Sequence, residues 1–339
     1  MNTAVLTDAL NGYEQALSAN DAVAATALVT RLLADGADPV AVLTDVVATA
    51  QRTVGSRWQR GEWTVAEEHA ATAIAVAATT AVAGHVRQVP VTHGRVLVAC
   101  AEREWHALPA MIIACALRAN GWDSTLLGAS TTPLRLSQHL QDLGPDAIAV
   151  SCSILGSLPT TRRFIEAGTG AGVPVVVGGP AFGYDDVRAT ALGATAWAPD
   201  AHGAVAVLAG LPAVVPPAGP LPADAVAEQS ALDLDHRRLV ALLRDRWSLT
   251  READADSRVL DVADDALHQA LHAVAAALLT GDPRPVAETS AWIADLLRTR
   301  GADATAITEL AALMTTALRD YPLAGRLVAE HFTGEWPVL

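Results

Sequence analysis

Five short apolar runs between residues 94 and 210 constrain the possible folds of this chain more than any other feature. They read RVLVACA, DSTLLGA, AIAVSCS, VPVVVGG and ATAWAPD, and stretches long enough for helices separate them. Such a nearly continuous content of Val, Ile, Leu and Ala is typical of strands that are buried on both faces of a parallel sheet. The pattern therefore predicts a doubly wound, flavodoxin-like α/β domain over residues 94–210.

The residues before this domain predict a four-helix bundle over residues 1–88. Asp38 and Pro39 stand in the order of an N-cap and a first helical position, and Thr64 with Glu67 gives the signature of a capping box. The connections between the predicted helices are too short to join anything but neighbouring helices.

The residues after the α/β domain predict a linker and a second helical domain. Residues 211–229 are rich in proline, which favours an extended, semi-rigid connector. Residues 230–339 contain several segments with helical periodicity, and we expect them to form a globin-like helical domain. The predicted fold class is therefore a multidomain combination of α and α/β architecture.

Composition restricts the possible partners. The formal net charge is −14, with 37 acidic against 23 basic residues, which argues against nucleic acid as a direct partner. Cys100, Cys115 and Cys152 have neither the spacing of a metal site nor that of a disulfide framework. The sequence shows no recognisable secretion signal and no uncharged membrane span, so we expect a soluble, cytoplasmic protein without a membrane partner.

The segment EWHALP, Glu104–Pro109, follows the first predicted strand. In an open α/β sheet, ligands bind beyond the carboxyl ends of the strands, which is where this segment is expected to lie. The carboxylate of Glu104 is placed to hold one tautomer of the His106 imidazole. Further candidates follow the third and fourth strands, and these are Ser151, Ser153, Ser157, Gly178 and Gly179. We expect serine hydroxyls to donate to a ligand or to the Glu104 carboxylate, and the glycines to let the backbone approach a bulky ligand.

In order and spacing these residues resemble the D-x-H-x-x-G, S-x-L and G-G signature of cobalamin-binding domains. The resemblance implies that His106 is the lower axial ligand of cobalt and that the nucleotide tail is buried beside the sheet. The chain departs from the signature with Glu104 for Asp, Pro109 for Gly and Ser153 for Leu, and Pro109 removes a backbone donor near the tail. Without the resemblance, His106 would be interpreted as a solvated loop residue of an ordinary flavodoxin-like domain.

The predicted bundle carries a second motif, in which nine residues separate Trp58 from the pair Glu68 and His69. It resembles the W-x9-E-H motif of CarH-type photoreceptors, whose bundle caps an adenosyl group on cobalt. In CarH the residue after the Trp is a His that ligates cobalt after photolysis, whereas this chain has Gln59, so His69 or water is the candidate substitute. CarH also has a DNA-binding domain before its bundle, and this chain is not expected to act as a repressor by itself. The alternative is that Trp58 is a core residue and Glu68 a solvated charge.

The order of the three domains resembles that of the photocobilins, photoreceptors that pair adenosylcobalamin with biliverdin. The resemblance implies a bilin in the last domain, and the candidates for its propionate, pyrrole and carbonyl contacts are Arg237, Arg238, Arg244, Arg246, His268 and His272. No cysteine follows Cys152, so binding is expected to be noncovalent. A metal site at His268 and His272 is not expected, because no cysteine or carboxylate extends the pair at similar spacing. The alternative is a dimerisation or signalling bundle without a ligand.

Together these features predict a light-sensing photoreceptor rather than an enzyme. We expect its partners to be the two small-molecule chromophores and further copies of the chain, in a homo-oligomer whose state depends on light. The alternative function is a corrinoid carrier protein of a cobalamin-dependent methyltransferase system. That function would explain His106 and the bundle but would leave the W-x9-E-H motif and the last domain without a role.

Overall fold

A computed structural model describes residues 3–251 and 257–333 of the chain. Within these residues the chain divides into two compact units. The first unit holds Met1–Trp58 and Trp63–Ala218, and the second holds Gln59–Glu62 and Gly219–Leu339.

The first unit begins with the predicted four helices. These are α1 (Thr3–Ser18), α2 (Ala22–Ala34), a third helix that runs from α3 (Pro39–Ala41) through a π-helical segment (Val42–Val47) into α4 (Ala48–Gln59), and α5 (Val65–Val86). The predicted caps are confirmed. The Asp38 carboxylate accepts a hydrogen bond from the amide of Val40, while Thr64 and Glu67 satisfy each other's backbone amides.

Helix α5 is long and apolar enough, by length and composition, to cross a membrane, and it is the one such helix among the described residues. In the structure it packs against α2 and contributes Ile74, Ala78 and Val82 to the core of the bundle. Its apolar character is therefore explained by burial against neighbouring helices.

A parallel sheet follows in the same unit, and all five predicted strands are confirmed. They are β1 (Arg95–Ala101), β2 (Asp123–Thr131), β3 (Ala147–Ser151), β4 (Val175–Gly178) and β5 (Ala196–Ala198). Their order in the sheet is β2-β1-β3-β4-β5. The strand order reverses between β1 and β3, so the chain leaves these two strands toward opposite faces of the sheet, and sheets of this kind bind ligands at that point of the carboxyl edge.

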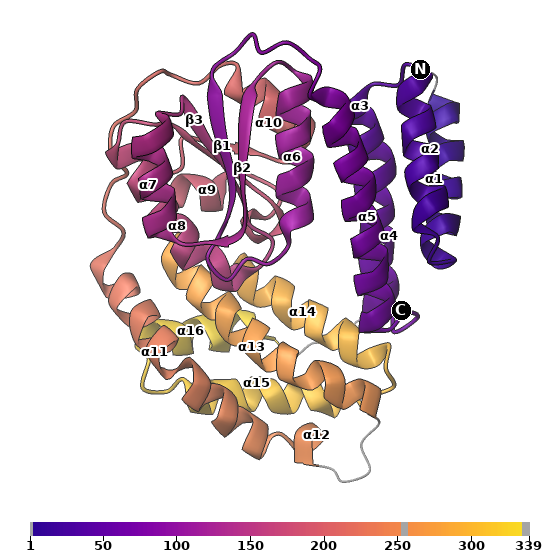
Figure 1. Ribbon diagram of the computed structural model, residues 1–339. Coiled ribbons are helices and arrows are strands. Elements are labelled where there is room, and N and C mark those ends of the chain that lie inside the picture. The colour runs from indigo at the N-terminus through magenta and orange to yellow at the C-terminus, as the bar shows by residue number, and fades with distance from the viewer. Residues whose placement is uncertain (1–2, 252–256, 334–339) are drawn as a thin grey trace. The chain divides into compact units, whose positions relative to one another are not determined.

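Helices cover both faces of the sheet (Figure 1). On one side lie α6 (Ala107–Ala119) and α10 (Ala201–Leu208), and on the other α7 (Pro133–Leu143), α8 (Leu158–Gly170) and α9 (Val187–Ala191). Helix α6 serves two cores, because Ile112 and Cys115 pack with the bundle while Ala110 and Leu117 pack with the sheet. The start of α6, where the candidate histidine lies, is thereby held between the bundle and the sheet.

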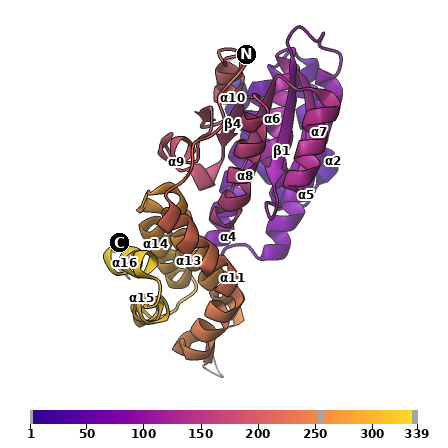
Figure 2. The same ribbon diagram turned by 90° about the vertical axis from the view of Figure 1, so that its left-hand side faces the viewer.

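The second unit is helical, as predicted. Its helices are α11 (Ala223–Arg246), α12 (Ser248–Arg251), α13 (Ser257–Thr280), α14 (Arg284–Arg298), α15 (Thr305–Ala317) and α16 (Pro322–His331). Helix α13 contacts α11, α14 and α16 (Figure 2). The prediction that residues 211–229 form one extended linker is wrong in its second half, because α11 already begins at Ala223. The prolines end at Pro222, and the residues that follow favour a helix.

Candidate functional site

The loop between β1 and α6 presents a histidine at the carboxyl edge of the sheet. His106 is the residue before the first turn of α6, and its side chain is 59% exposed. Its Nδ1 lies 2.6 Å from Oε1 of Glu104, and its backbone amide donates to the same oxygen at 2.9 Å. The predicted pairing of Glu104 with His106 is therefore present in the structure.

Glu104 is completely buried, and it joins the loop after β1 to the loop after β3 and to the end of β2. Its second carboxylate oxygen accepts hydrogen bonds from the backbone amides of Ser153 at 2.5 Å and Ile154 at 3.0 Å, after β3. Its carbonyl oxygen accepts from the amide of Ser130, in β2. A buried carboxylate with this many donors is held firmly, and it fixes the direction of the imidazole that it accepts from.

Glu104 and His106 each shift the pKa of the other. The hydrogen bond to Glu104 raises the pKa of His106 above its ordinary value, and the negative charge of Glu68 in α5 acts in the same direction. Burial alone would raise the pKa of Glu104, but the hydrogen bonds from His106 and Ser153 outweigh it and lower that pKa. Glu104 is therefore ionised at neutral pH. With Nδ1–H donating to it, the neutral imidazole keeps its electron pair on Nε2, the nitrogen that can bind a metal.

The serines after β3 divide into two roles. Of the two roles expected for the serine hydroxyls, donation to Glu104 is not found, because its donors after β3 are the backbone amides of Ser153 and Ile154. Donation to a ligand stays a prediction. A backbone amide has no residue signature, so only the turn after β3 could reveal it. Ser151 and Ser157 are both buried, and the Ser157 hydroxyl has no hydrogen-bond partner within the described residues. A buried hydroxyl of this kind is a free donor for a ligand that enters the site.

Gly178 and Gly179 are required by the sheet itself. A Cβ on Gly178 would lie 2.5 Å from the carbonyl oxygen of Ala198, and one on Gly179, whose φ is +102°, would strike the carbonyl oxygen of Cys152. These glycines therefore let neighbouring backbone segments approach each other. Their expected role in admitting a bulky ligand stays a prediction.

The bundle motif lies on the ends of two helices. Trp58 is half-buried near the end of α4, and Glu68 and His69 lie in the first turns of α5. The Glu68 carboxylate accepts from the Thr72 hydroxyl at 2.9 Å and lies 3.5 Å from Nε2 of His69. Helix α5, which carries Glu68 and His69, packs against α6, the helix that begins directly after His106. Thr72 was not anticipated, although it stands one helical turn after Glu68.

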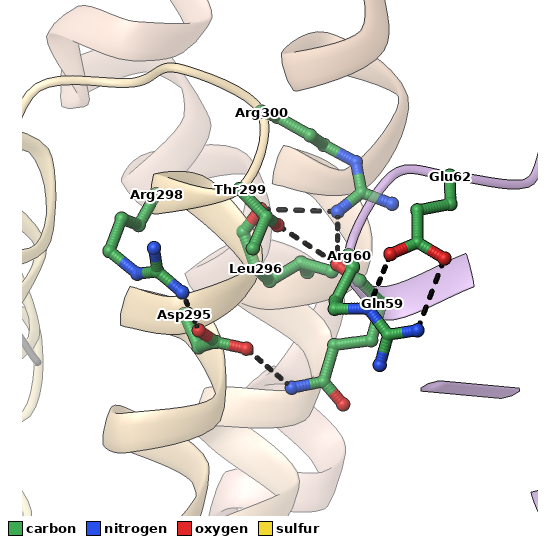
Figure 3. A network of polar contacts seen from close by, with 8 residues as sticks. All are labelled: Gln59, Arg60, Glu62, Asp295, Leu296, Arg298, Thr299 and Arg300. Carbon is green, nitrogen blue, oxygen red and sulfur yellow. Dashed lines mark hydrogen bonds and ion pairs between the residues drawn. The ribbon is translucent and has the colours of Figure 1, made fainter. Parts of the chain in front are cut away.

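Gln59, which directly follows Trp58, belongs to the second unit. Its side-chain amide donates to Oδ2 of Asp295 at 2.8 Å, and its carbonyl oxygen accepts from Thr299 and Arg300 at 2.9 Å each (Figure 3). Arg298 holds the other oxygen of Asp295 at 2.6 Å. Gln59 is therefore engaged with α14 and the residues that follow it.

The candidate bilin contacts are only partly brought together. Arg238 forms an ion pair with Asp235 at 2.7 Å, and Asp235 also accepts from the Tyr321 hydroxyl. Arg244 is paired with Asp264, and the remaining candidates Arg237 and Arg246 are exposed on α11. Two of the four arginines are thus already engaged with carboxylates of the same unit.

His268 and His272 lie together on α13, and a third histidine joins them from α11. Nε2 of His236 lies 2.7 Å from Nδ1 of His268, and the rings of His236 and His272 stack with centroids 4.5 Å apart. His236 was not grouped with the other two from the sequence. The signal was present, because His236 occupies the apolar stripe of α11 one turn after Leu232 and one turn before Leu239.

Comparison with known proteins identifies the ligand class of the first unit. Residues 94–208 match a family model described as a B12 binding domain. Residues 9–82 match a second family model with the same description. No curated protein is significantly similar to the chain.

Among solved structures, the monomethylamine corrinoid protein of Methanosarcina barkeri has a TM-score of 0.53 at 16% identity, over 59% of this chain and 97% of that one. The methanol:cobalamin methyltransferase complex MtaBC of the same organism gives 0.32 at 18% identity, over 60% and 80%. A cobalamin-binding protein of Desulfitobacterium hafniense gives 0.32 at 19% identity, over 58% and 96%. At these identities the first likeness shows a shared fold, and the two family matches show the ligand. The chain therefore contains two cobalamin-binding domains, a helical one over residues 9–82 followed by an α/β one over residues 94–208.

Proposed function

We propose that the protein is a cytoplasmic light sensor that holds adenosylcobalamin between the bundle and the β1–α6 loop and biliverdin among the helices of the second unit. It is a binding and signalling module and not an enzyme. The observation that carries the proposal is the packing of α5, which carries Glu68 and His69, against α6, which begins directly after His106, the candidate ligand of cobalt. A cofactor bound by His106 would therefore have the bundle motif above it.

The residues around His106 fit a corrinoid in three respects. Glu104 accepts from Nδ1 of His106 and leaves Nε2 for the metal, which is the usual arrangement around a ligating histidine. The buried Ser157 hydroxyl, without a partner among the described residues, can donate to a ligand. Trp105, beside His106, is 73% exposed, and a bound corrinoid would cover its ring.

The residues of the bundle motif, Trp58, Glu68 and His69, supply the response to light. A bound adenosylcobalamin supplies a cobalt–carbon bond that visible light breaks. Before illumination the Trp58 ring is suited to pack on the adenosyl group, and Glu68 and His69 are suited to hydrogen-bond its ribose or base. Once those contacts are gone, the ends of α4 and α5 are free to move. Gln59 follows Trp58 directly, and its side chain donates to Asp295 in α14. A displacement of Trp58 would therefore change this hydrogen bond.

Biliverdin is assigned to the second unit because half-buried imidazoles gather there. His268 and His272 offer donors to pyrrole or carbonyl groups, and Arg237 and Arg246 are exposed cations for the propionates. The three cysteines are buried, and burial raises the pKa of Cys115 to about 11 and that of Cys100 to about 12. Buried thiols with raised pKa values are poor nucleophiles, so the bilin is held noncovalently.

A corrinoid carrier for a methyltransferase is the second candidate, and the fold shared with the monomethylamine corrinoid protein favours it. Absorption spectroscopy of the full chain separates the two. Loaded with adenosylcobalamin, a sensor changes its cobalamin bands under green light and changes its elution volume in size-exclusion chromatography. A spectrum and an elution volume that are the same before and after illumination would exclude the sensor and leave the carrier.

The bilin has its own test. Biliverdin added to the full chain should give a red-shifted, structured absorption band, and the colour should separate from the protein on denaturation. If no band appears, the second unit has another role. Colour that stays with the denatured chain would contradict noncovalent binding.

A further inference from the structure

Three imidazoles converge between α11 and α13, outside the cobalamin-binding domains. The ligand atoms of His236, His268 and His272 all lie within 4.8 Å of one another, and each residue is half-buried. Among the described residues, this is the one group of three or more His, Cys, Asp or Glu side chains close enough together to hold a metal ion. The function proposed above gives no part to His236.

The histidines stand on a firm scaffold. His268 and His272 are separated by one helical turn, so both imidazoles project from the same face of α13. His236 comes from the apolar stripe of α11, between the buried Leu232 and Leu239. Helices α11 and α13 pack against each other along a shared apolar core. Ligands carried by two packed helices keep their relative positions without a bound ion.

We propose that His236, His268 and His272 bind a divalent transition-metal ion, and that zinc is the ion this ligand set fits best. Neutral imidazole is a preferred ligand of zinc, and two histidines four residues apart on a helix are a common chelating pair. Magnesium and calcium are disfavoured, because they prefer oxygen ligands.

The distances suit a tetrahedral ion after small rotations of the rings. With zinc–nitrogen bonds of about 2.0–2.1 Å, two nitrogens of a tetrahedral site are separated by roughly 3.3 Å. The present separations bracket that value, from 2.7 Å between Nε2 of His236 and Nδ1 of His268 to the 4.8 Å limit of the group. Without a metal, His236 and His268 share one proton in their hydrogen bond. An incoming zinc ion takes the place of that proton, and the ring that donated it carries its proton on the other ring nitrogen instead, so that both imidazoles stay neutral.

Three protein ligands leave the fourth position of the ion open. Because the three residues are only half-buried, water or another small donor can reach that position. Since the proposed bilin contacts include His268 and His272, zinc and biliverdin would compete for the same nitrogens. The metal site does not require that the chain binds either chromophore.

Zinc binding to the full chain tests the proposal. The protein is prepared without cobalamin or bilin, treated with a chelator and desalted, and zinc is then titrated in by calorimetry. We expect one zinc ion per chain, and we expect His236→Gln and His272→Gln each to weaken it by about 100-fold or more. His331→Gln, in α16 of the same unit but outside the group, is the matched control and should bind zinc as the wild type does.

X-ray absorption of the zinc-loaded wild type gives a second readout that needs no variant to fold. It should show three imidazole ligands on each zinc ion. The proposal is overturned if the wild type binds no zinc, if the two glutamine variants bind it as tightly as the wild type, or if the zinc has fewer than three imidazole ligands.

Discussion

Nδ1 of His106 lies 2.6 Å from Oε1 of Glu104, and the two side chains differ sharply in their exposure to solvent. The Glu104 side chain is completely buried, whereas that of His106 is 59% exposed. Because the buried Glu104 carboxylate fixes the Nδ1 side of the ring and the rest of the ring is accessible, Nε2 of His106 is presented to a ligand. The charge of this acceptor is therefore the first feature to test.

Glu104→Gln should weaken cobalamin binding by about 10- to 100-fold, because the neutral amide holds the imidazole less firmly and makes it less basic. Equilibrium binding of hydroxocobalamin, followed by absorbance, measures the change. Glu102→Gln is the matched control, since Glu102 lies in the same loop two residues earlier. Equal affinities for Glu104→Gln and Glu102→Gln would contradict a role of the Glu104 charge.

Ser157→Ala should change stability and binding in opposite directions. Removing a buried hydroxyl that lacks a partner among the described residues should raise the free energy of unfolding of the cobalamin-free protein by about 1 kcal/mol. The affinity for cobalamin should fall about tenfold, because the ligand loses a donor. Chemical denaturation and equilibrium binding measure the two effects. Ser137→Ala removes a hydroxyl bonded within α7 and should leave affinity unchanged. A lower stability with no loss of affinity would make Ser157 a packing residue.

Trp58→Ala should discriminate between forms of cobalamin. If the indole packs on the adenosyl group, the variant loses about tenfold in affinity for adenosylcobalamin and much less for hydroxocobalamin. Trp63→Ala is the matched control, because Trp63 packs against the bundle core and stacks with Arg57 at 5.3 Å. The control should affect both forms alike. The same loss for both forms in Trp58→Ala would place Trp58 in the core alone.

The contact of Asp295 with Gln59 should depend on pH. The hydrogen bond from Arg298 lowers the pKa of Asp295 below its ordinary value of 3.8, and that from Gln59 adds to the effect. A carboxylate with a lowered pKa stabilises the fold fully above its unfolded pKa and loses this contribution as pH falls through its folded pKa. Asp295→Asn should therefore be less stable than the wild type by about 0.5–1 kcal/mol at pH 7, and equally stable once the pH has fallen below the lowered pKa of Asp295 in the folded protein.

Thermal unfolding of wild type and Asp295→Asn between pH 7 and pH 2.5 measures this difference. Asp303→Asn, whose carboxylate accepts from Thr305 outside this network, reports the loss of an unrelated exposed charge. A stability difference for Asp295→Asn that does not change with pH would mean that the charge of Asp295 is not its source.

The amino-acid sequence by itself determined the elements and the place of the site. The five apolar runs became the five strands of the sheet, and the caps at Asp38 and Thr64 were formed as predicted. His106 could be placed at the carboxyl edge because strand and helix patterns are local and repeat every two or 3.6 residues. The start of α11 was placed too late, since proline content was given more weight than the helix-forming residues after Pro222.

Only the tertiary structure decided which groups meet. Glu104 accepts from the amides of Ser153 and Ile154, about 50 residues further on, and Gln59 meets Asp295, 236 residues away. His236 joins His268 across two helices. Local periodicity shows which face of an element is buried but not which element will cover it. That choice is made when the helices and strands pack to fill a common core, and the polar contacts follow from it.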